Sequence, residues 1–312
     1  MKNFLIRRIF YAIIAVIGVT LMIFVLSRMS GDPRVLFIDE HGGGFGTEAW
    51  EKMGEEMGLD KPVPIQYAMW LKDILSGDFG KSLAQQQPVT TILKDRAGAS
   101  IRLGVAAWIF GTLVGVPLGI LSAINRGSAW DYIARTFALF GQSLPSFWSG
   151  IMGILIFAGV LGWLPAGTMG EGSFSIKHLI LPAIVLGWLP AAGYLRLTRS
   201  SMLEVMDTEY IKLARAKGVK YTKVVWKHAF RNALIVPLTY SGLLLIGFIT
   251  GTTVVETVFS WPGLGRLAIN SVTGNDFPVV AAIMFFTMLL YVVVVLFLDL
   301  IYAFIDPRIR AK

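Results

Sequence analysis

LGVAAWIFGTLVGVPLGILSAI, residues 103–124, is a continuous apolar stretch without Asp, Glu, Lys or Arg. A helix that crosses a bilayer needs about 20 predominantly apolar residues, so this stretch is long enough to cross a membrane once. Five more apolar stretches near this length or longer lie on either side of it: Ile9–Met29, Ile133–Leu161, Leu179–Leu197, Leu234–Val255 and Val279–Ile305. The sequence therefore predicts an all-α membrane protein with six transmembrane helices.

The composition supports this class. Of the 312 residues, 55% are apolar and 15% are charged, against about 25% charged residues in soluble globular proteins. The stretches 133–161 and 279–305 exceed the length that one crossing needs, and we expect a tilt or a kink in each. The stretch 9–29 follows a basic start but is long for the core of a signal peptide, so we expect it to be retained as the first crossing.

The distribution of lysine and arginine predicts the orientation, because cationic loops near the ends of crossings resist translocation. Lys2, Arg7 and Arg8 place the amino terminus in the cytoplasm. Residues 196–231 carry nine Lys or Arg against three Asp or Glu, whereas residues 30–99 carry seven basic and eleven acidic residues. The net charge of +8 is therefore interpreted as the positive-inside bias of a membrane protein and not as a surface for nucleic acid.

These patterns divide the chain into five parts. They are a cytoplasmic segment at 1–8, a first crossing at 9–29, an extracytoplasmic segment at 30–100, a transmembrane core at 101–305 that includes a cytoplasmic loop at 196–232, and a cytoplasmic tail at 306–312. The extracytoplasmic segment is too short for an independent domain with a large core, so we expect a small cap. We expect two short helices in it, one from Thr47 to Gly58 and one from Pro62 to Gly77.

Small residues recur in the apolar stretch at 103–124. Gly111, Gly115 and Gly119 fall on one face of a helix, because every fourth residue of a helix lies on the same side. Small residues on one face let another helix approach closely inside a membrane. The sequence leaves open whether that helix belongs to this chain or to a second membrane subunit.

The basic loop at 196–232 predicts a helical knob. Asp207 or Thr208 can cap a short helix that runs through Ala216, and Gly218 can supply the left-handed turn that ends it. A second short helix from about Thr222 leads into the fifth crossing. From the charge alone, the loop is either an ordinary cytoplasmic loop or a surface for a partner.

The order of residues in this loop resembles a known pattern. EYIKLARAKG at 209–218 is followed by KHAFRNAL at 227–234, and together they resemble the EAA-type coupling loop of binding-protein-dependent ABC importer permeases, in the version of the oligopeptide and dipeptide subfamily. Further segments resemble that subfamily in the same order: NFLIRRI at 3–9, GDP at 31–33, GLDKPVPIQYAMWL at 58–71, GDFGKS at 77–82, LPAIVLG at 181–187, RLTRSSMLEVM at 196–206, ETVFSWPGLGRL at 256–267 and DPRIR at 306–310. HAFR at 228–231 stands where the general permease pattern has Ile-x-Leu-Pro, which is itself similar to the peptide subfamily.

The resemblance implies a type I ABC importer permease fold and a function. The chain would be the transmembrane permease subunit of an ATP-driven importer that translocates peptides or related small solutes. The loop would form a coupling helix that docks on an ATP-binding subunit. The residues implied in this coupling are Glu209, Tyr210, Ala214, Arg215, Ala216, Lys217, Gly218, His228, Arg231 and Asn232.

The resemblance also implies partners and a location. The partners would be a second permease subunit, which makes a heterodimer, two ATP-binding subunits, an extracytoplasmic substrate-binding protein and membrane lipid. ATP and Mg²⁺ would bind to the partner subunits, and this chain would hold no cofactor. The location would be a bacterial-type inner membrane.

The segment that begins at Glu256 is a candidate gate. Its Pro and Gly residues suggest a re-entrant or gate-like loop, and the residues concerned are Glu256, Trp261, Pro262, Gly263, Gly265 and Arg266. Two interpretations stay open, which are contact with cargo or binding protein and structural capping by Glu256.

Several other classes of protein are not supported by the sequence. GDFGKS at 77–82 lacks the first glycine of a phosphate-binding loop, because Leu75 stands there. The chain contains no cysteine, and its three histidines are far apart in sequence, so we expect no metal site and no catalytic residues. The alternative to an ATP-driven permease is an ion-coupled secondary transporter, which would need buried coupling carboxylates and inverted repeats. We find few acids within the stretches and no clear repeat.

Overall fold

The computed structural model describes residues 2–29, 34, 47–56, 58–170, 175–250 and 252–305. The chain divides into two compact units, one made of Met1–Ala97 with Leu267–Lys312 and the other of Gly98–Arg266. Each unit is considered by itself. The predicted cytoplasmic tail at 306–312 lies outside the described residues.

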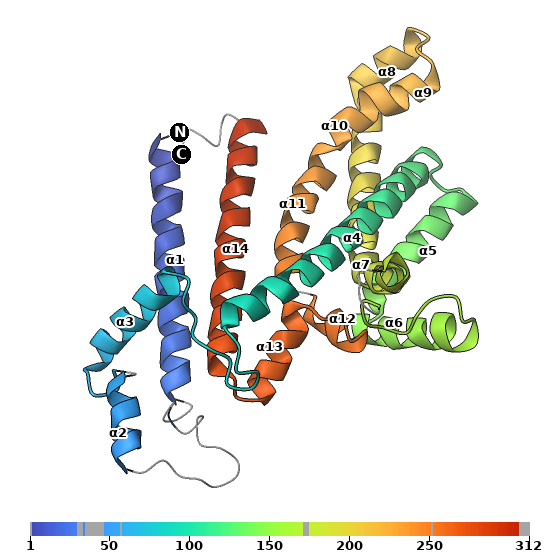
Figure 1. The fold of residues 1–312 in the computed structure, drawn as a ribbon. Coiled ribbons are helices and arrows are strands. Elements are labelled where there is room, and N and C mark those ends of the chain that lie inside the picture. Colours follow the sequence, from blue (N-terminus) through green and yellow to red (C-terminus); the bar gives the residue numbers. More distant parts are fainter. Residues whose placement is uncertain are drawn as a thin grey trace. The chain divides into compact units, whose positions relative to one another are not determined.

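The first unit pairs the two ends of the chain. Helix α1 (Lys2–Met29) and helix α14 (Phe277–Ile305) pack side by side (Figure 1). The two expected short helices are present as α2 (Thr47–Glu56) and α3 (Val63–Leu75). Gly58 and Gly77 follow them with φ of +66° and +85°, the left-handed conformation that glycine adopts without steric cost.

The loop after α3 is closed by a carboxylate of the same unit. Asp276 is buried and accepts hydrogen bonds from the hydroxyl of Ser82 and from the backbone N–H groups of Leu83 (3.1 Å) and Ala84 (3.4 Å). The amides beside the GDFGKS segment therefore already bind an anionic group of the chain itself. This arrangement agrees with the sequence-based exclusion of a phosphate-binding loop.

The second unit is a bundle of helices. Helix α4 begins in the first unit and continues into the second, which also contains α5 to α12. Their bounds are α4 Val89–Ile124, α5 Ala129–Ser143, α6 Ser146–Gly153, the π-helix η2 Ile154–Val160, α7 Ile176–Met206, α8 Glu209–Ala216, α9 Tyr221–Lys223, the π-helix η3 Val224–Phe230, α10 Arg231–Ala233, α11 Ile235–Thr250 and α12 Thr253–Val258, and α13 Leu264–Thr273 continues into the first unit. The start of α4 lies before residue 101, where the sequence placed the start of the transmembrane core.

The structure confirms the all-α class but leaves the number of crossings as a prediction. Four helical segments are long and apolar enough to cross a membrane: Ile6–Leu26, Val89–Ile124, Ile176–Met206 and Phe277–Leu298. A fifth crossing would be the pair Ala129–Ser143 and Ser146–Val160, which is bent by 107°. The apolar part of α11, Ile235–Leu245, is shorter.

The bend replaces the single helix that the sequence predicted at 133–161. Leu144 has an extended backbone (φ −91°, ψ 125°), and Pro145 follows it. The ring of a proline disfavours helical geometry at the preceding residue, and proline has no N–H to donate. The expected kink is therefore a complete break in the helix.

The glycine stripe of α4 packs against α7 of the same chain. A β-carbon at Gly115 would overlap the carbonyl oxygen of Ala191, and one at Gly119 would lie 2.7 Å from the carbonyl oxygen of Leu195. At Gly111 the nearest atom of α7 would be 3.2 Å away. Of the two partners that the sequence left open, the structure favours a helix of the chain itself.

This contact predicts that a glycine-to-alanine substitution has different effects at two sites on α4. Gly115→Ala is expected to lower the midpoint of thermal unfolding of the purified chain, because the added methyl group forces α4 and α7 apart. Gly98→Ala is the matched control, since nothing lies within 4 Å of its β-carbon position. This control is expected to be neutral or to stabilise by up to about 1 kcal/mol through helix propensity. Equal midpoints for the two variants would contradict the close contact.

Candidate functional site

The first candidate site is the α8 knob, which we define as residues 208–223. The helix starts after Thr208, whose backbone is extended (φ −72°, ψ 153°). The hydroxyl of Thr208 donates to the carbonyl oxygen of Val205 (2.6 Å) and does not cap the helix amides. Gly218 ends the knob's helix with φ of +73°, as the sequence predicted.

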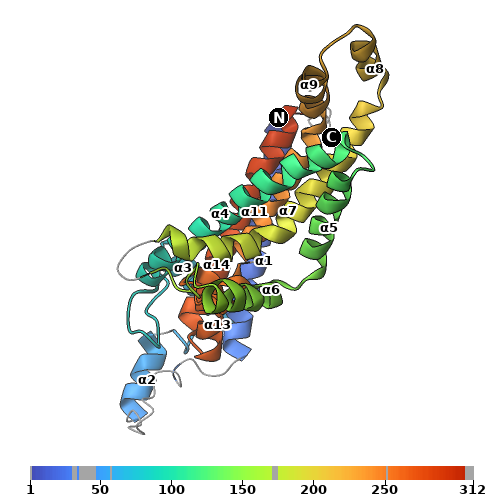
Figure 2. The ribbon, with the colours of Figure 1, turned by 90° about the vertical axis from the view of Figure 1, so that its right-hand side faces the viewer.

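The α8 knob is anchored by one buried side chain. Ile211 is fully buried in an apolar cluster that joins α8 to four other helices. The other buried members are Ile120 and Ala123 of α4, Met202 of α7, Val224, Val225 and Ala229 of η3, and Ala233 of α10. Figures 1 and 2 show α8 and α9 beyond the ends of α4 and α7. The knob projects from the bundle and is held firmly at its base.

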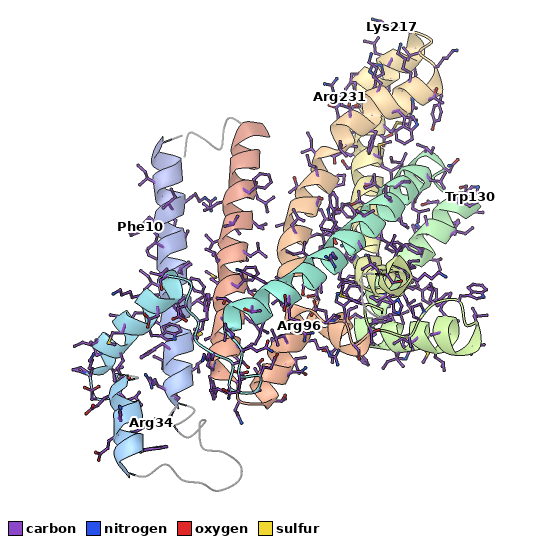
Figure 3. The ribbon with its side chains drawn as sticks, in the orientation of Figure 1. Phe10, Arg34, Arg96, Trp130, Lys217 and Arg231 are labelled. Atoms are coloured by element: carbon purple, nitrogen blue, oxygen red, sulfur yellow. The ribbon has the colours of Figure 1, made fainter. Side chains whose placement is uncertain are left out.

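The opposite side of the knob is exposed and carries both apolar and basic groups. Tyr210 and Leu213 have exposed fractions of 44% and 56%. Arg215 and Lys217 are also exposed, and Lys217 lies at the far tip in Figure 3. Aromatic, aliphatic and cationic side chains on a rigid projection are suited to contact with another protein.

The structure brings several of the predicted coupling residues together. Glu209, Tyr210, Ala214, Arg215 and Ala216 lie on α8, Lys217 and Gly218 form its terminal turn, His228 lies on η3, and Arg231 and Asn232 lie on α10. The side-chain amide of Asn232 donates to the hydroxyl of Tyr210 and to the carbonyl oxygen of His228, at 2.9 Å each. Arg231 is exposed, and Figure 3 shows it on the stem below the knob.

Two residues of the knob were not among the coupling residues predicted from the sequence. Ile211 is the buried side chain that anchors α8, and Leu213 has an exposed fraction of 56% on its outer side. Residues two apart in a helix point to different sides, so the alternation of Ile211 and Leu213 is the signal that could have identified both.

An ion pair between a partly buried arginine and a buried aspartate was also not predicted from the sequence. The guanidinium of Arg199 on α7 donates to both carboxylate oxygens of Asp131 on α5, at 2.9 and 3.0 Å. Asp131 is buried and also accepts from the hydroxyl of Ser122 and from the N–H of Gly127 (3.0 Å). This two-pronged pairing fixes the end of α4, the start of α5 and α7 together. Its signal in the sequence is an acid and an arginine at the ends of apolar stretches.

The second candidate site is the gate segment, residues 256–266. Glu256 is fully buried. Its carboxylate accepts hydrogen bonds from the hydroxyl of Ser100 (2.6 Å) and from the backbone N–H of Arg266 (3.0 Å). The same Ser100 hydroxyl accepts from the N–H of Leu264 (2.8 Å). Of the two interpretations left open by the sequence, this geometry favours structural capping for Glu256.

The rest of the gate segment is folded around this carboxylate. Trp261 is fully buried, and its indole N–H donates to the carbonyl oxygen of Ala99 (2.9 Å). A side chain at Gly263 would overlap the carboxyl group of Glu256. Pro262, Gly265 and Arg266 are partly exposed. These three candidate residues are thus accessible to another molecule, unlike the buried Glu256, Trp261 and Gly263.

The two sites differ in place and in chemistry. Figure 1 shows α8 and α12 at opposite ends of the second unit. Within the described residues, no group of three or more His, Asp or Glu side chains is placed to hold a metal ion. Both sites are held in position by buried side chains, Ile211 in the α8 knob and Glu256 in the gate segment.

The Ser100–Glu256 pair can be tested by a double-mutant cycle. Ser100→Ala is expected to destabilise the chain by about 1–3 kcal/mol, because it removes a hydrogen bond from a buried carboxylate and one from the partly buried N–H of Leu264. Glu256→Gln and the double variant complete the cycle, and denaturant unfolding measures each. The two effects should be non-additive by about 0.5–3 kcal/mol. Ser149→Ala, whose hydroxyl makes an exposed bond to Pro145, is the control, and additive effects at positions 100 and 256 would refute the pair.

The chain matches two known protein families, one over each part of its sequence. Residues 115–311 match the family of the binding-protein-dependent transport system inner membrane component, and residues 1–104 match the N-terminal family of the same membrane components. The two matches together cover almost the whole sequence.

Similar proteins agree with this match. The chain is 37% identical to a dipeptide transport system permease protein of Alkalihalophilus pseudofirmus, over 99% of this chain and 100% of that protein. It is 37% identical to an oligopeptide transport system permease protein of Bacillus subtilis, over 99% of this chain and 100% of that protein. It is 38% identical to a dipeptide transport system permease protein of Escherichia coli over the full length of both.

Solved structures show the same fold at low sequence identity. A chain of the inward-facing MetNI methionine ABC transporter matches with a TM-score of 0.56 and 18% identity, over 70% of this chain and 95% of that chain. A chain of an amino acid ABC transporter matches with a TM-score of 0.53 and 16% identity, over 68% of this chain and 93% of that chain. With its anchored knob, its apolar helices and these matches, the chain belongs to the family of inner membrane components of binding-protein-dependent transport systems.

Proposed function

We propose that this permease subunit translocates peptides or related small solutes that an extracytoplasmic binding protein delivers. The proposal rests on relatives named as dipeptide and oligopeptide permeases that align over the full length of the chain. ATP hydrolysis on separate subunits, which bind the ATP and Mg²⁺, drives the process. This chain needs two arrangements of its helices and no catalytic residue of its own.

The orientation follows from the charge. With Lys2, Arg7 and Arg8 at one end and the basic loop 196–232 on the same side, both termini and the α8 knob lie in the cytoplasm. The gate segment then lies on the outer side. Pro262, Gly265 and Arg266, the predicted gate residues that are partly exposed, are the contacts for cargo or for the binding protein.

The structural observation that supports coupling to an ATP-binding subunit is the anchored knob. Ile211 ties α8 to a cluster that includes residues of α4 and α7, so a displacement of α8 is passed to helices that run through the second unit. The exposed face with Tyr210, Leu213 and Lys217 receives an ATP-binding subunit. The complete importer contains two such subunits, a second permease subunit and the binding protein.

Docking at the α8 knob can be tested with two matched substitutions. Leu213→Asp places a charge in the proposed interface and is expected to abolish co-purification of the ATP-binding subunit and ATP-dependent uptake. Ile176→Asp also replaces an exposed apolar side chain by aspartate, at the other end of the second unit, where the exposed fraction of Ile176 is 69%. This variant should leave co-purification intact. If Leu213→Asp retains the ATP-binding subunit at wild-type level, the proposed docking face is wrong.

The energy source separates the proposal from an ion-coupled transporter. The buried carboxylates of Asp131, Glu256 and Asp276 all accept hydrogen bonds that hold loops or helix ends, which argues against their use as coupling groups. Vesicles that contain the importer should take up a peptide with ATP inside and the binding protein outside. Uptake should stop on ATP depletion even when a proton or sodium gradient is applied. Gradient-driven uptake without ATP would contradict the proposal.

A further inference from the structure

Helix α3 of the predicted external cap is attached to the second half of α1, at Thr20 and Phe24. The hydroxyls of Tyr67 on α3 and Thr20 on α1 are 2.9 Å apart and share a hydrogen bond. Tyr67 and Trp70 also pack on the ring of Phe24, with ring centroids 5.5 and 5.7 Å from it. Thr20 and Phe24 are buried at this contact.

The position of these contacts along α1 gives their depth. The apolar run of α1 between Arg8 and Arg28 extends from Ile9 to Leu26, and its length of about 27 Å is close to the thickness of the hydrocarbon layer of a bilayer. Thr20 lies six residues inside the Leu26 end, which corresponds to about 9 Å at 1.5 Å per residue. A hydroxyl that bonds to Thr20 is therefore below the level of the lipid headgroups when α1 crosses the membrane.

A second contact of the same segment gives a similar depth. The ring of Phe79, four residues after α3 ends, packs on Phe285 of α14 with centroids 5.8 Å apart. Phe285 lies eight residues inside the apolar segment that starts at Phe277, or about 12 Å. Three residues after Phe79, Ser82 donates a hydrogen bond to Asp276, which directly precedes α14. The chain is therefore back at the first turn of α14 by residue 82.

The outward side of α3 is suited to lipid. Tyr67, Trp70 and Ile74 face α1 or the interior of the unit, while Ala68 and Leu75, seven residues apart and hence on one face, are exposed. The exposed fraction of Leu75 is 65%. Lys72 and Asp73 are exposed too. A lysine next to apolar residues can extend its amine to the headgroups while its stem stays in lipid.

We propose that α3 and Phe79 are embedded in the leaflet at the Met29 end of α1, with the face of Ala68 and Leu75 against lipid acyl chains. The cap is then divided into a lipid-embedded part (α3) and a part outside the membrane (α2). The occupant of this face is lipid because the contacts with Thr20 and Phe285 place α3 and Phe79 at the depth of the acyl chains, and Ala68 and Leu75 are exposed there. The inference rests on α1 crossing the membrane and does not depend on the transported solute.

The absence of cysteine from the sequence makes a direct test possible. Single-cysteine variants Ala68→Cys and Leu75→Cys of the complete importer are labelled with a nitroxide and reconstituted into lipid nanodiscs. Collision rates with oxygen, which concentrates in lipid, and with a water-soluble nickel chelate are measured by spin resonance. Leu21→Cys on the exposed side of α1 is the lipid control, and Glu51→Cys on α2 is the aqueous control.

The expected result is a ratio of oxygen to nickel collisions at positions 68 and 75 that matches position 21 and exceeds position 51. Nickel collisions as frequent as at position 51 would show an aqueous cap. Low collision rates with both reagents would show a face covered by protein. Either of these results, at either position, overturns the inference, whereas a failure of position 21 to behave as lipid would refute α1 as a crossing and the proposed membrane topology with it.

Discussion

Burial of the Ile211 side chain is the interaction on which the position of the α8 knob, and with it the proposed coupling, depends. A short helix of eight residues is not stable alone in water, and the α8 knob carries mostly polar and charged groups apart from this side chain and Leu213. The apolar cluster around Ile211 includes residues of α4, α7, η3 and α10. Because packed interiors are nearly incompressible, we expect a displacement of the knob to move the whole cluster with it.

Three buried carboxylates fix contacts between helices and loops, each within one of the two units. Asp131 fastens α5 to α7, Glu256 fastens the gate segment to the stretch of α4 around Ser100, and Asp276 closes the loop after α3. Each carboxylate accepts at least one backbone N–H in addition to a side-chain hydroxyl. Such satisfied groups confer a unique geometry, since a buried carboxylate without partners would be costly. These three groups therefore fix local geometry within each unit.

Local features were predictable from the sequence, and long-range ones were not. The bounds of α8, its end at Gly218 and the cap helices follow from turn residues and apolar spacing, which act within a few residues. The break at Pro145 was predicted only as a kink, because the sequence does not show whether neighbouring helices can accommodate a proline. The pairing of Ser100 with Glu256 joins residues 156 positions apart, and no periodicity in one sequence encodes it.

The central claim is that the α8 knob moves as one body with the helices beneath it. Spin labels at Lys217→Cys on the knob and Arg126→Cys after α4, both exposed and both in the second unit, give the distance between knob and bundle by pulsed dipolar spectroscopy. The account predicts the same distance distribution in the nucleotide-free importer and in the importer trapped with ATP. A shift or a marked broadening on trapping would show that the knob swings on a hinge, and it would contradict the account.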